Sequence, residues 1–129
     1  MSEQTPSLPV RILVVEDEFL IRLTLVEALG DEGFDVLESG SGDAALPILQ
    51  ADPSISLLLT DIQLPGLLDG RGLARRARES RPDLPVLYMT GRPDPTAEAR
   101  ASPHEHYISK PYSLADISKA VRSLTAAKG

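Results

Sequence analysis

The sequence of 129 residues contains no cysteine, which excludes disulfide bonds, thiolate metal sites and cysteine catalysis. It also has no uninterrupted apolar run that approaches the length of a membrane-spanning helix, and no internal repeat or low-complexity tract. Residues 1–9, MSEQTPSLP, lack the basic start and apolar centre of a signal peptide, and we interpret them as a disordered lead-in. We expect one domain over residues 10–129, located in the cytoplasm and without membrane contact.

Basic residues are outnumbered by acidic ones, 13 to 19, and the net charge of -6 argues against nonspecific nucleic-acid binding. Arginines nevertheless cluster along one segment, at Arg71, Arg75, Arg76, Arg78 and Arg81. We interpret this cluster as the exposed, solvated face of a helix.

The two histidines, His104 and His106, alternate without a third ligand in view, so we interpret them as exposed loop residues and not as a metal site.

Short apolar runs alternate with segments of helical periodicity along the chain. We predict strands at residues 10–15, 34–37, 55–60, 85–90 and 107–109. We predict helices at residues 19–29, within 39–50 starting near Asp43, at 70–81, and at 113–128, where Ser113 and Asp116 form a capping-box pattern. Gly30 can end the first helix. The predicted inner face of that helix carries four apolar residues, Leu20, Leu23, Val26 and Leu29.

This alternation favours an α/β fold in which parallel strands are joined by right-handed crossovers and helices cover both faces of the sheet. One segment, GRPDPTAEARASPHEH, departs from the pattern. Because it contains Pro93, Pro95 and Pro103, at most one short helix fits there, near residues 96–101.

Several polar residues stand at the carboxyl ends of the predicted strands, where open parallel sheets bind their ligands. They are Glu16, Asp17, Asp61, Thr90 and Lys110. If the sheet forms as predicted, three carboxylates, one hydroxyl and one ammonium converge, and Mg²⁺ prefers oxygen ligands of this kind. An aspartate can also act as a covalent nucleophile toward a phosphoryl group, whose charge a metal ion and a cation neutralise.

Each of these residues also has an ordinary structural interpretation. The acidic run EDE at 16–18 could be solvated loop charges, Asp61 could be an N-cap or turn residue, and Thr90 and Lys110 could be a plain strand threonine and surface lysine. Their placement at corresponding strand ends favours a common site instead. Glu18 is set apart, because its negative charge suits the start of the next helix, and we predict that it is not a direct metal ligand.

Taken together, these segments resemble the receiver domain of two-component response regulators from residue 10 to about residue 127. The resemblance rests on ILVVEDE, LLLTDIQLPG, DGRGLA, PVLYMTG and YISKPY, which are weak signals singly and specific as a set. It implies a flavodoxin-like, doubly wound, five-stranded parallel sheet of order 2-1-3-4-5 with helices on both faces and a short or irregular fourth helix. The first residue Met1 and the ending AAKG suit a stand-alone single-domain protein, with a segment of a larger hybrid protein as the alternative.

The resemblance also implies roles for individual residues. Asp61 would be the phosphoacceptor, and Thr90 and Lys110 would contact the phosphoryl group. The peptide bond before Pro111 would be cis, and Tyr107 would be an aromatic switch residue whose rotamer follows Thr90. Mg²⁺ would be held by oxygen atoms of four residues, Glu16, Asp17, Asp61 and Gln63, the last through its backbone carbonyl.

Three features depart from the usual pattern of this family. The loop LPGLLDG is one residue longer than the commonest form, so we expect a reshaped turn after Asp61. Gly91 and Arg92 follow Thr90, and Arg92 could either hold the phosphoryl group or pair with Asp94. The proline-rich segment 92–103 falls where the family's fourth helix forms part of the signalling and dimerisation face.

The leading functional hypothesis is a phosphorylation switch in which a histidine kinase or histidine phosphotransfer protein donates a phosphoryl group to Asp61. The change would alter contacts with an unidentified downstream protein, and the chain would be a monomer or a phosphorylation-dependent homodimer without direct nucleic-acid binding. It would assist its own phosphorylation and dephosphorylation without being an enzyme for a separate substrate. One alternative is a phosphorylation-independent protein-binding module of the same fold. A Mg²⁺-dependent phosphatase or phosphotransferase is a third, but such enzymes need a second acid where Gln63 stands.

Overall fold

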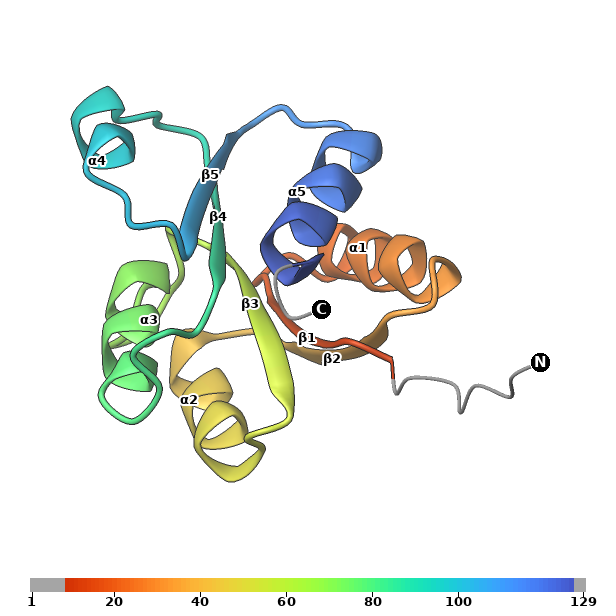
Figure 1. The fold of residues 1–129 in the computed structure, drawn as a ribbon, viewed down its shortest axis with the longest axis horizontal. Helices are drawn as coiled ribbons and strands as arrows, with labels where there is room; N and C mark the ends of the chain where they lie inside the picture. Colours follow the sequence, from red (N-terminus) through yellow and green to blue (C-terminus); the bar gives the residue numbers. More distant parts are fainter. Residues whose placement is uncertain (1–8, 127–129) are drawn as a thin grey trace.

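The computed structural model describes residues 9–126, in which strands and helices alternate along the chain (Figure 1). The strands are β1 (Arg11–Val15), β2 (Asp35–Ser39), β3 (Ile55–Asp61), β4 (Val86–Thr90) and β5 (Glu105–Ser109). The helices are α1 (Phe19–Asp31), α2 (Gly42–Ala51), α3 (Gly70–Arg78), α4 (Pro95–Ala99) and α5 (Leu114–Ala126). Most of the predicted lead-in, residues 1–8, lies outside the described residues, as do residues 127–129.

The strands form one parallel sheet in the order β2-β1-β3-β4-β5, which confirms the predicted doubly wound topology. The register aligns their carboxyl ends. Val15 lies opposite Ser39 on one side and Thr60 on the other, and Thr90 lies opposite Ser109. Residues that follow these strands therefore meet at one edge of the sheet.

Successive residues of each strand point to opposite faces, and this divides the core into two layers. Leu13 and Val15 of β1 pack with α2 and α3, whereas Ile12 and Val14 pack with α1 and α5. Figure 1 shows α1 and α5 on one side of the sheet and α2 and α3 on the other. Both faces of the central strands are thus covered, which explains their uniformly apolar sequences.

The predicted inner face of α1 is wrong in part. Leu20 is 73% exposed, and the buried residues are Leu25 and Leu29, joined by the partly buried Ile21. The reason is geometric: a strict three-residue spacing falls behind a helical turn of about 3.6 residues, whereas a four-residue spacing stays closer to one face.

Helix α1 also continues past Gly30, the residue predicted to end it. Gly33, at φ 97°, ends the helix instead. Its N–H donates to the Gly30 carbonyl at 3.0 Å, and the Phe34 N–H donates to the Leu29 carbonyl at 3.2 Å. This pair of bonds is a Schellman motif, which requires the left-handed backbone that glycine adopts without strain.

Helix α4 is short, as the prolines predicted. Asp94 caps it by accepting hydrogen bonds from the N–H groups of Thr96 at 3.0 Å and Ala97 at 3.3 Å. Among the described residues Arg92 and Asp94 form no ion pair, so this one of the two alternatives for Arg92 is not met. The helix buries none of its residues, and Figure 1 shows it at the periphery, away from α3.

The interpretation of the arginine cluster as a solvated helix face is wrong for three of its members. The guanidinium groups of Arg71, Arg78 and Arg81 donate hydrogen bonds to Tyr107 Oη, Glu105 and the Ile55 carbonyl, respectively. Their long side chains reach across the sheet, which helical periodicity alone cannot reveal. The helix itself ends at Arg78 instead of residue 81.

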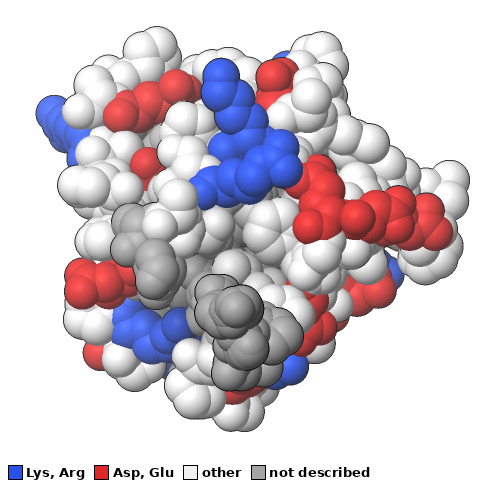
Figure 2. Space-filling model, turned by 45° about the vertical axis from the view of Figure 1, so that its right-hand side comes forward, with Lys and Arg blue, Asp and Glu red and all other residues white. Residues whose placement is uncertain are grey.

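Other surface features differ less from expectation. His106 lies in β5 instead of a loop, and the half-buried His104 lies 3.6 Å from Asp83. On the face in Figure 2, acidic and basic side chains form separate small groups without one continuous basic surface. Between residues 9 and 126, none of the helices combines the length and the apolar character needed to cross a membrane.

Candidate functional site at the carboxyl edge of the sheet

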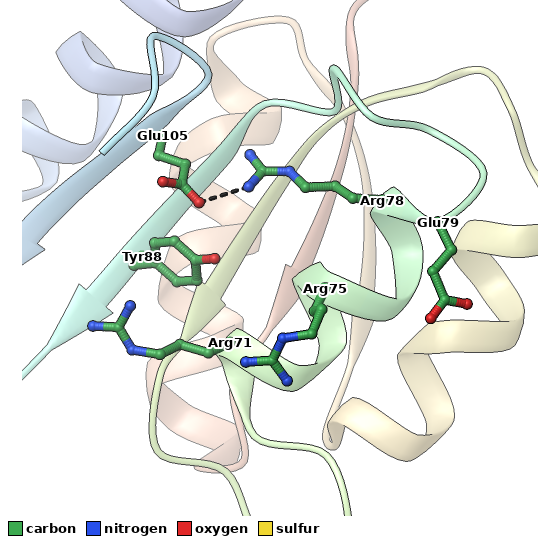
Figure 3. A pocket seen from close by; sticks show the side chains of 6 residues that line it. All are labelled: Arg71, Arg75, Arg78, Glu79, Tyr88 and Glu105. Carbon is green, nitrogen blue, oxygen red and sulfur yellow. Dashed lines mark hydrogen bonds and ion pairs between the residues drawn. The ribbon is translucent and has the colours of Figure 1, made fainter. Parts of the chain in front are cut away.

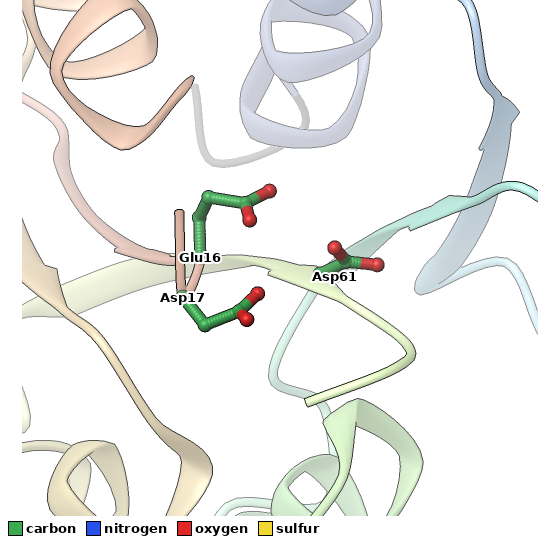
Figure 4. A group of neighbouring side chains, drawn as sticks. All are labelled: Glu16, Asp17 and Asp61. Carbon is green, nitrogen blue, oxygen red and sulfur yellow. The ribbon is translucent and has the colours of Figure 1, made fainter. Parts of the chain in front are cut away.

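The structure brings the predicted acidic residues together at the carboxyl edge of the sheet. Glu16 and Asp17 follow β1, and Asp61 is the last residue of β3 (Figure 4). One carboxylate oxygen from each lies within 4.8 Å of the others, and among residues 9–126 these three form the one such group of potential metal ligands. Glu18 stays outside the group, at the N-cap position of α1.

Lys110 completes this acidic group from the end of β5. Its Nζ donates to Asp61 Oδ2 at 2.8 Å. Burial alone would lower the pKa of the Lys110 ammonium, but the hydrogen bond and the charge of Asp61 outweigh it and raise this pKa. The lysine is therefore a fixed positive charge beside the Asp61 carboxylate.

Glu16 is the most confined of the carboxylates. It is fully buried, its Oε2 accepts the Glu18 N–H at 3.1 Å, and its Oε1 is buried with no hydrogen-bond partner within the described part of the chain. Burial, followed by the nearby charge of Asp61, raises the pKa of Glu16 from 4.5 to about 7. An unpartnered buried carboxylate oxygen is costly, and a divalent cation between these oxygens would remove that cost, so the residues present fit a Mg²⁺ site.

Asp61 is held by the backbone around it. It is 5% exposed, and the Gln63 N–H approaches its Oδ1 at 3.4 Å. Behind it, α3 begins at Gly70, where a Cβ atom would overlap the Asp61 carbonyl oxygen and lie 2.9 Å from Ile62 Cα. Gly70 therefore lets the start of α3 approach the end of β3 closely, which fixes the position of Asp61.

The longer loop after Asp61 is anchored by Asp43 at the start of α2. The Asp43 carboxylate accepts the N–H groups of Leu67 and Leu68, each at 3.0 Å. Gly66, at φ 94°, makes the turn that presents these amides. The loop after Asp61 is thus tied to a neighbouring helix.

Thr90 lies at the end of β4 and is 4% exposed. Its Oγ1 accepts the Arg92 N–H at 2.9 Å. Across the strand pair, the Lys110 N–H donates to the Thr90 carbonyl at 2.7 Å, and the Lys110–Pro111 peptide bond is cis. The ends of β4 and β5 are therefore fixed relative to each other.

Tyr107 lies in β5, on the α3 side of the sheet. Its hydroxyl accepts a hydrogen bond from Arg71 Nη1 at 2.7 Å, and its ring stacks on that of Tyr88 with centroids 4.9 Å apart. The side chain is half-buried. The resting position of Tyr107 is therefore fixed by a residue of α3.

Sequence reasoning missed the residues that support the site from outside. Arg22 of α1 donates to the Glu16 carbonyl at 2.8 Å and pairs with Glu38 at 2.8 Å, so it links the acidic loop to β2. Asp43 marks the predicted start of a helix, and its sequence context does not identify it as a loop anchor. No local pattern marks either contact, because both join segments that are distant in the chain.

A parallel sheet of this order, with carboxylates and a lysine at its carboxyl edge, defines the doubly wound, flavodoxin-like class. Within it, the chain belongs to the response regulator receiver domain family, whose sequence model matches residues 12–122. The chain is 39% identical to the response regulator receiver protein CpdR of Brucella abortus, over 91% of this chain and 98% of CpdR.

Two further similarities agree with this assignment. The chain is 33% identical to the response regulator MprA of Mycolicibacterium vanbaalenii, but it spans 51% of that protein. The crystal structure of a response regulator receiver protein from Sinorhizobium medicae superposes with a TM-score of 0.84 at 31% identity, covering 94% of this chain and 98% of that one. Receiver domains are signalling modules of two-component systems and not classical enzymes, and Mg²⁺ and phosphorylation are typical of them.

Proposed function

We propose that residues 10–129 form a receiver whose Asp61 accepts a phosphoryl group from the phosphohistidine of a histidine kinase or a histidine phosphotransfer protein. A carboxylate oxygen of Asp61 bonds to phosphorus as the bond from phosphorus to the donor's imidazole nitrogen breaks. The imidazole keeps the electron pair and takes up a proton. The observation that carries the proposal is the 2.8 Å contact of Lys110 with Asp61 beside the unpartnered oxygen of Glu16.

The acidic group would hold Mg²⁺ through Glu16, Asp17, Asp61 and the backbone carbonyl of Gln63. When bound, the ion neutralises negative charge on the oxygens of the transferred phosphoryl group. Lys110 contributes a second positive charge, and its ammonium can follow the negative charge from the Asp61 carboxylate to the new phosphoryl oxygens.

Thr90 and Tyr107 would couple phosphorylation of Asp61 to a change at the protein surface. Thr90 Oγ1 is the acceptor in its bond with the Arg92 N–H, so its own proton is available for a phosphoryl oxygen. Tyr107 would follow Thr90 and give up the hydrogen bond from Arg71. The surface formed by α3 and β5 would thereby differ between the two states and change its contacts with a downstream protein.

An exposed apolar surface supports docking of the phosphoryl donor beside Asp61. Phe19 is 59% exposed, Leu20 73% and Leu114 41%, and all three lie where α1 and α5 begin. Leu20 and Leu114 also line a cavity of about 340 Å³, together with Ile21 and Tyr112 among others. An amphipathic helix that carries the phosphohistidine could cover these side chains as it presents the phosphoryl group.

Incubation with acetyl phosphate and Mg²⁺, followed by intact-protein mass spectrometry, tests the proposal. We expect one added phosphoryl group in the native protein and in Asp31→Asn, an exposed aspartate at the end of α1, and none in Asp61→Asn. No incorporation in the native protein, or full incorporation in Asp61→Asn, contradicts the proposal. The first of these outcomes would favour the phosphorylation-independent binding module. Turnover of a generic phosphoester would instead favour a phosphatase or phosphotransferase.

A further inference from the structure

A second cavity, of about 410 Å³, lies between α3, β4 and β5, away from the acidic group (Figure 3). Its lining residues are Arg71, Arg75, Arg78, Glu79, Tyr88 and Glu105. The cavity is open because α4, which follows β4, has only five residues and buries none of them. Figure 1 shows α4 lying outward from α3, and among residues 9–126 α3 is the one helix that lines the cavity.

One aromatic residue, Tyr88, lines this cavity. Tyr88 is 3% exposed, and its hydroxyl makes no hydrogen bond to any of residues 9–126. Figure 3 shows that hydroxyl pointing toward the space between the arginines. The Arg71 guanidinium lies 5.6 Å from the Tyr88 ring centroid and 5.2 Å from that of Tyr107, so stacking holds this cation in place.

The charges in the cavity do not cancel. Arg78 pairs with Glu105 at 2.6 Å, and Glu79 pairs at 3.6 Å with Arg76, which does not line the cavity. Arg71 and Arg75 form no ion pair with any described residue. The cavity therefore presents two guanidinium groups that have no ion-pair partner among residues 9–126, in a chain whose net charge is -6.

We propose that this cavity docks an acidic segment of a partner protein, with carboxylates paired to Arg71 and Arg75 and an apolar side chain placed against Tyr88. Guanidinium groups pair with carboxylates bidentately, and an aromatic wall suits a neighbouring apolar group. The negative net charge opposes the broad phosphate contacts that nucleic acid or an anionic membrane makes, whereas a short peptide needs only this one cavity. The docking goes beyond phosphoryl acceptance and does not require a phosphoryl group on Asp61.

The test is a titration of the ¹⁵N-labelled protein with an N-acetylated, C-amidated peptide of sequence EEFEE, followed by amide chemical shifts. The matched peptide QQFQQ controls for the carboxylates. We expect saturable shifts in α3 and β5 with EEFEE and none with QQFQQ. Shifts confined to other elements, or no saturable shift at millimolar peptide, would overturn the proposal.

Two charge reversals on the same helix separate specific docking from general electrostatics. Arg75→Glu removes a lining cation, whereas Arg76→Glu makes the same charge change outside the cavity. We expect the first to weaken EEFEE binding at least about tenfold and the second less than about threefold. Equal weakening by both variants contradicts a specific site. Neither side chain is buried, and Arg75→Gln, expected to weaken binding less than Arg75→Glu, gives a second check if the reversal perturbs folding.

Sedimentation of the unliganded protein shows whether a second copy of the chain occupies the cavity instead of an acidic partner. A monomer is expected at the concentrations of the titration. A dimer that Arg75→Glu dissociates, together with no EEFEE binding, would assign the cavity to a second copy of the chain and overturn the acidic-partner proposal. Phosphoryl incorporation at Asp61 is measured in parallel and is expected to be unchanged in Arg75→Glu and Arg76→Glu.

Discussion

Two parts of the sheet are built in opposite ways. One is the carboxyl end of β1 and β3, here called the edge, and the other is the side of β4 and β5 that lines the cavity with α3, here called the corner. At the edge, strands that are buried at all but one residue each hold acidic groups in fixed positions, and one carboxylate oxygen of Glu16 has no hydrogen-bond partner among residues 9–126. At the corner, β5 is only partly buried, α4 buries none of its residues, and the Arg71 guanidinium lies over the rings of Tyr88 and Tyr107. The difference indicates that dense packing positions charges for a reaction, while sparse packing leaves a surface open to contact.

The largest expected effect on stability comes from a substitution that disrupts the close approach of α3 to the end of β3. Gly70→Ala places a Cβ atom against the Asp61 carbonyl oxygen and Ile62 Cα, neither of which can move without shifting β3. We expect a loss of unfolding free energy above about 3 kcal/mol, measured by urea denaturation. Gly30→Ala is the control, because its Cβ would meet nothing within 4 Å in α1, and it should stabilise by about 0.5–1 kcal/mol. A similar effect of both substitutions would show that the edge is not tightly packed.

Removing the charge of Glu16 should stabilise the protein without metal. At pH 8, Glu16→Gln replaces a buried, unpartnered carboxylate by a neutral group, and we expect a gain of about 1–3 kcal/mol in EDTA. The same variant should lose most of the stabilisation that Mg²⁺ gives the native protein. Thermal melts with and without Mg²⁺ measure both effects. Glu18→Gln, on an exposed residue, should show neither, and an equal response of the two variants would remove Glu16 from the metal site.

The stability of the metal-free native protein should also depend on pH through Glu16. Its pKa is raised to about 7 in the folded chain from 4.5, so the folded state binds more protons between these values. The contribution of Glu16 to the free energy of unfolding therefore falls as pH rises from about 4.5 to 7. Urea denaturation in EDTA across this range should show the decrease in the native protein and a smaller one in Glu16→Gln. Parallel pH profiles of the two proteins would contradict this assignment.

The contrast between edge and corner also explains what sequence reasoning could predict. Glu16, Asp61, Thr90 and Lys110 each stand at the carboxyl end of a strand, so a local pattern located them and the rule for parallel sheets brought them together. No local sequence pattern marked the Arg71 guanidinium that lies over the Tyr88 ring. Arg71 resembles any arginine on a helix until α3 is placed beside β5, and the displacement of α4 depends on tertiary packing that short-range patterns do not encode.

The smallest expected effect compares the caps of two helices. Ser41 caps α2 by accepting the Ala44 N–H at 3.1 Å, and α2 buries Leu46 and Leu49 against the sheet. Ser41→Ala should therefore cost about 1 kcal/mol of unfolding free energy. Asp94→Ala removes a comparable cap from α4, but because α4 buries no residue, its loss should cost less than about 0.5 kcal/mol. Urea denaturation measures both, and amide exchange should quicken in α4 alone after Asp94→Ala. Equal costs would mean that α4 packs against the domain as firmly as α2, and the open cavity beside it would then have to be reconsidered.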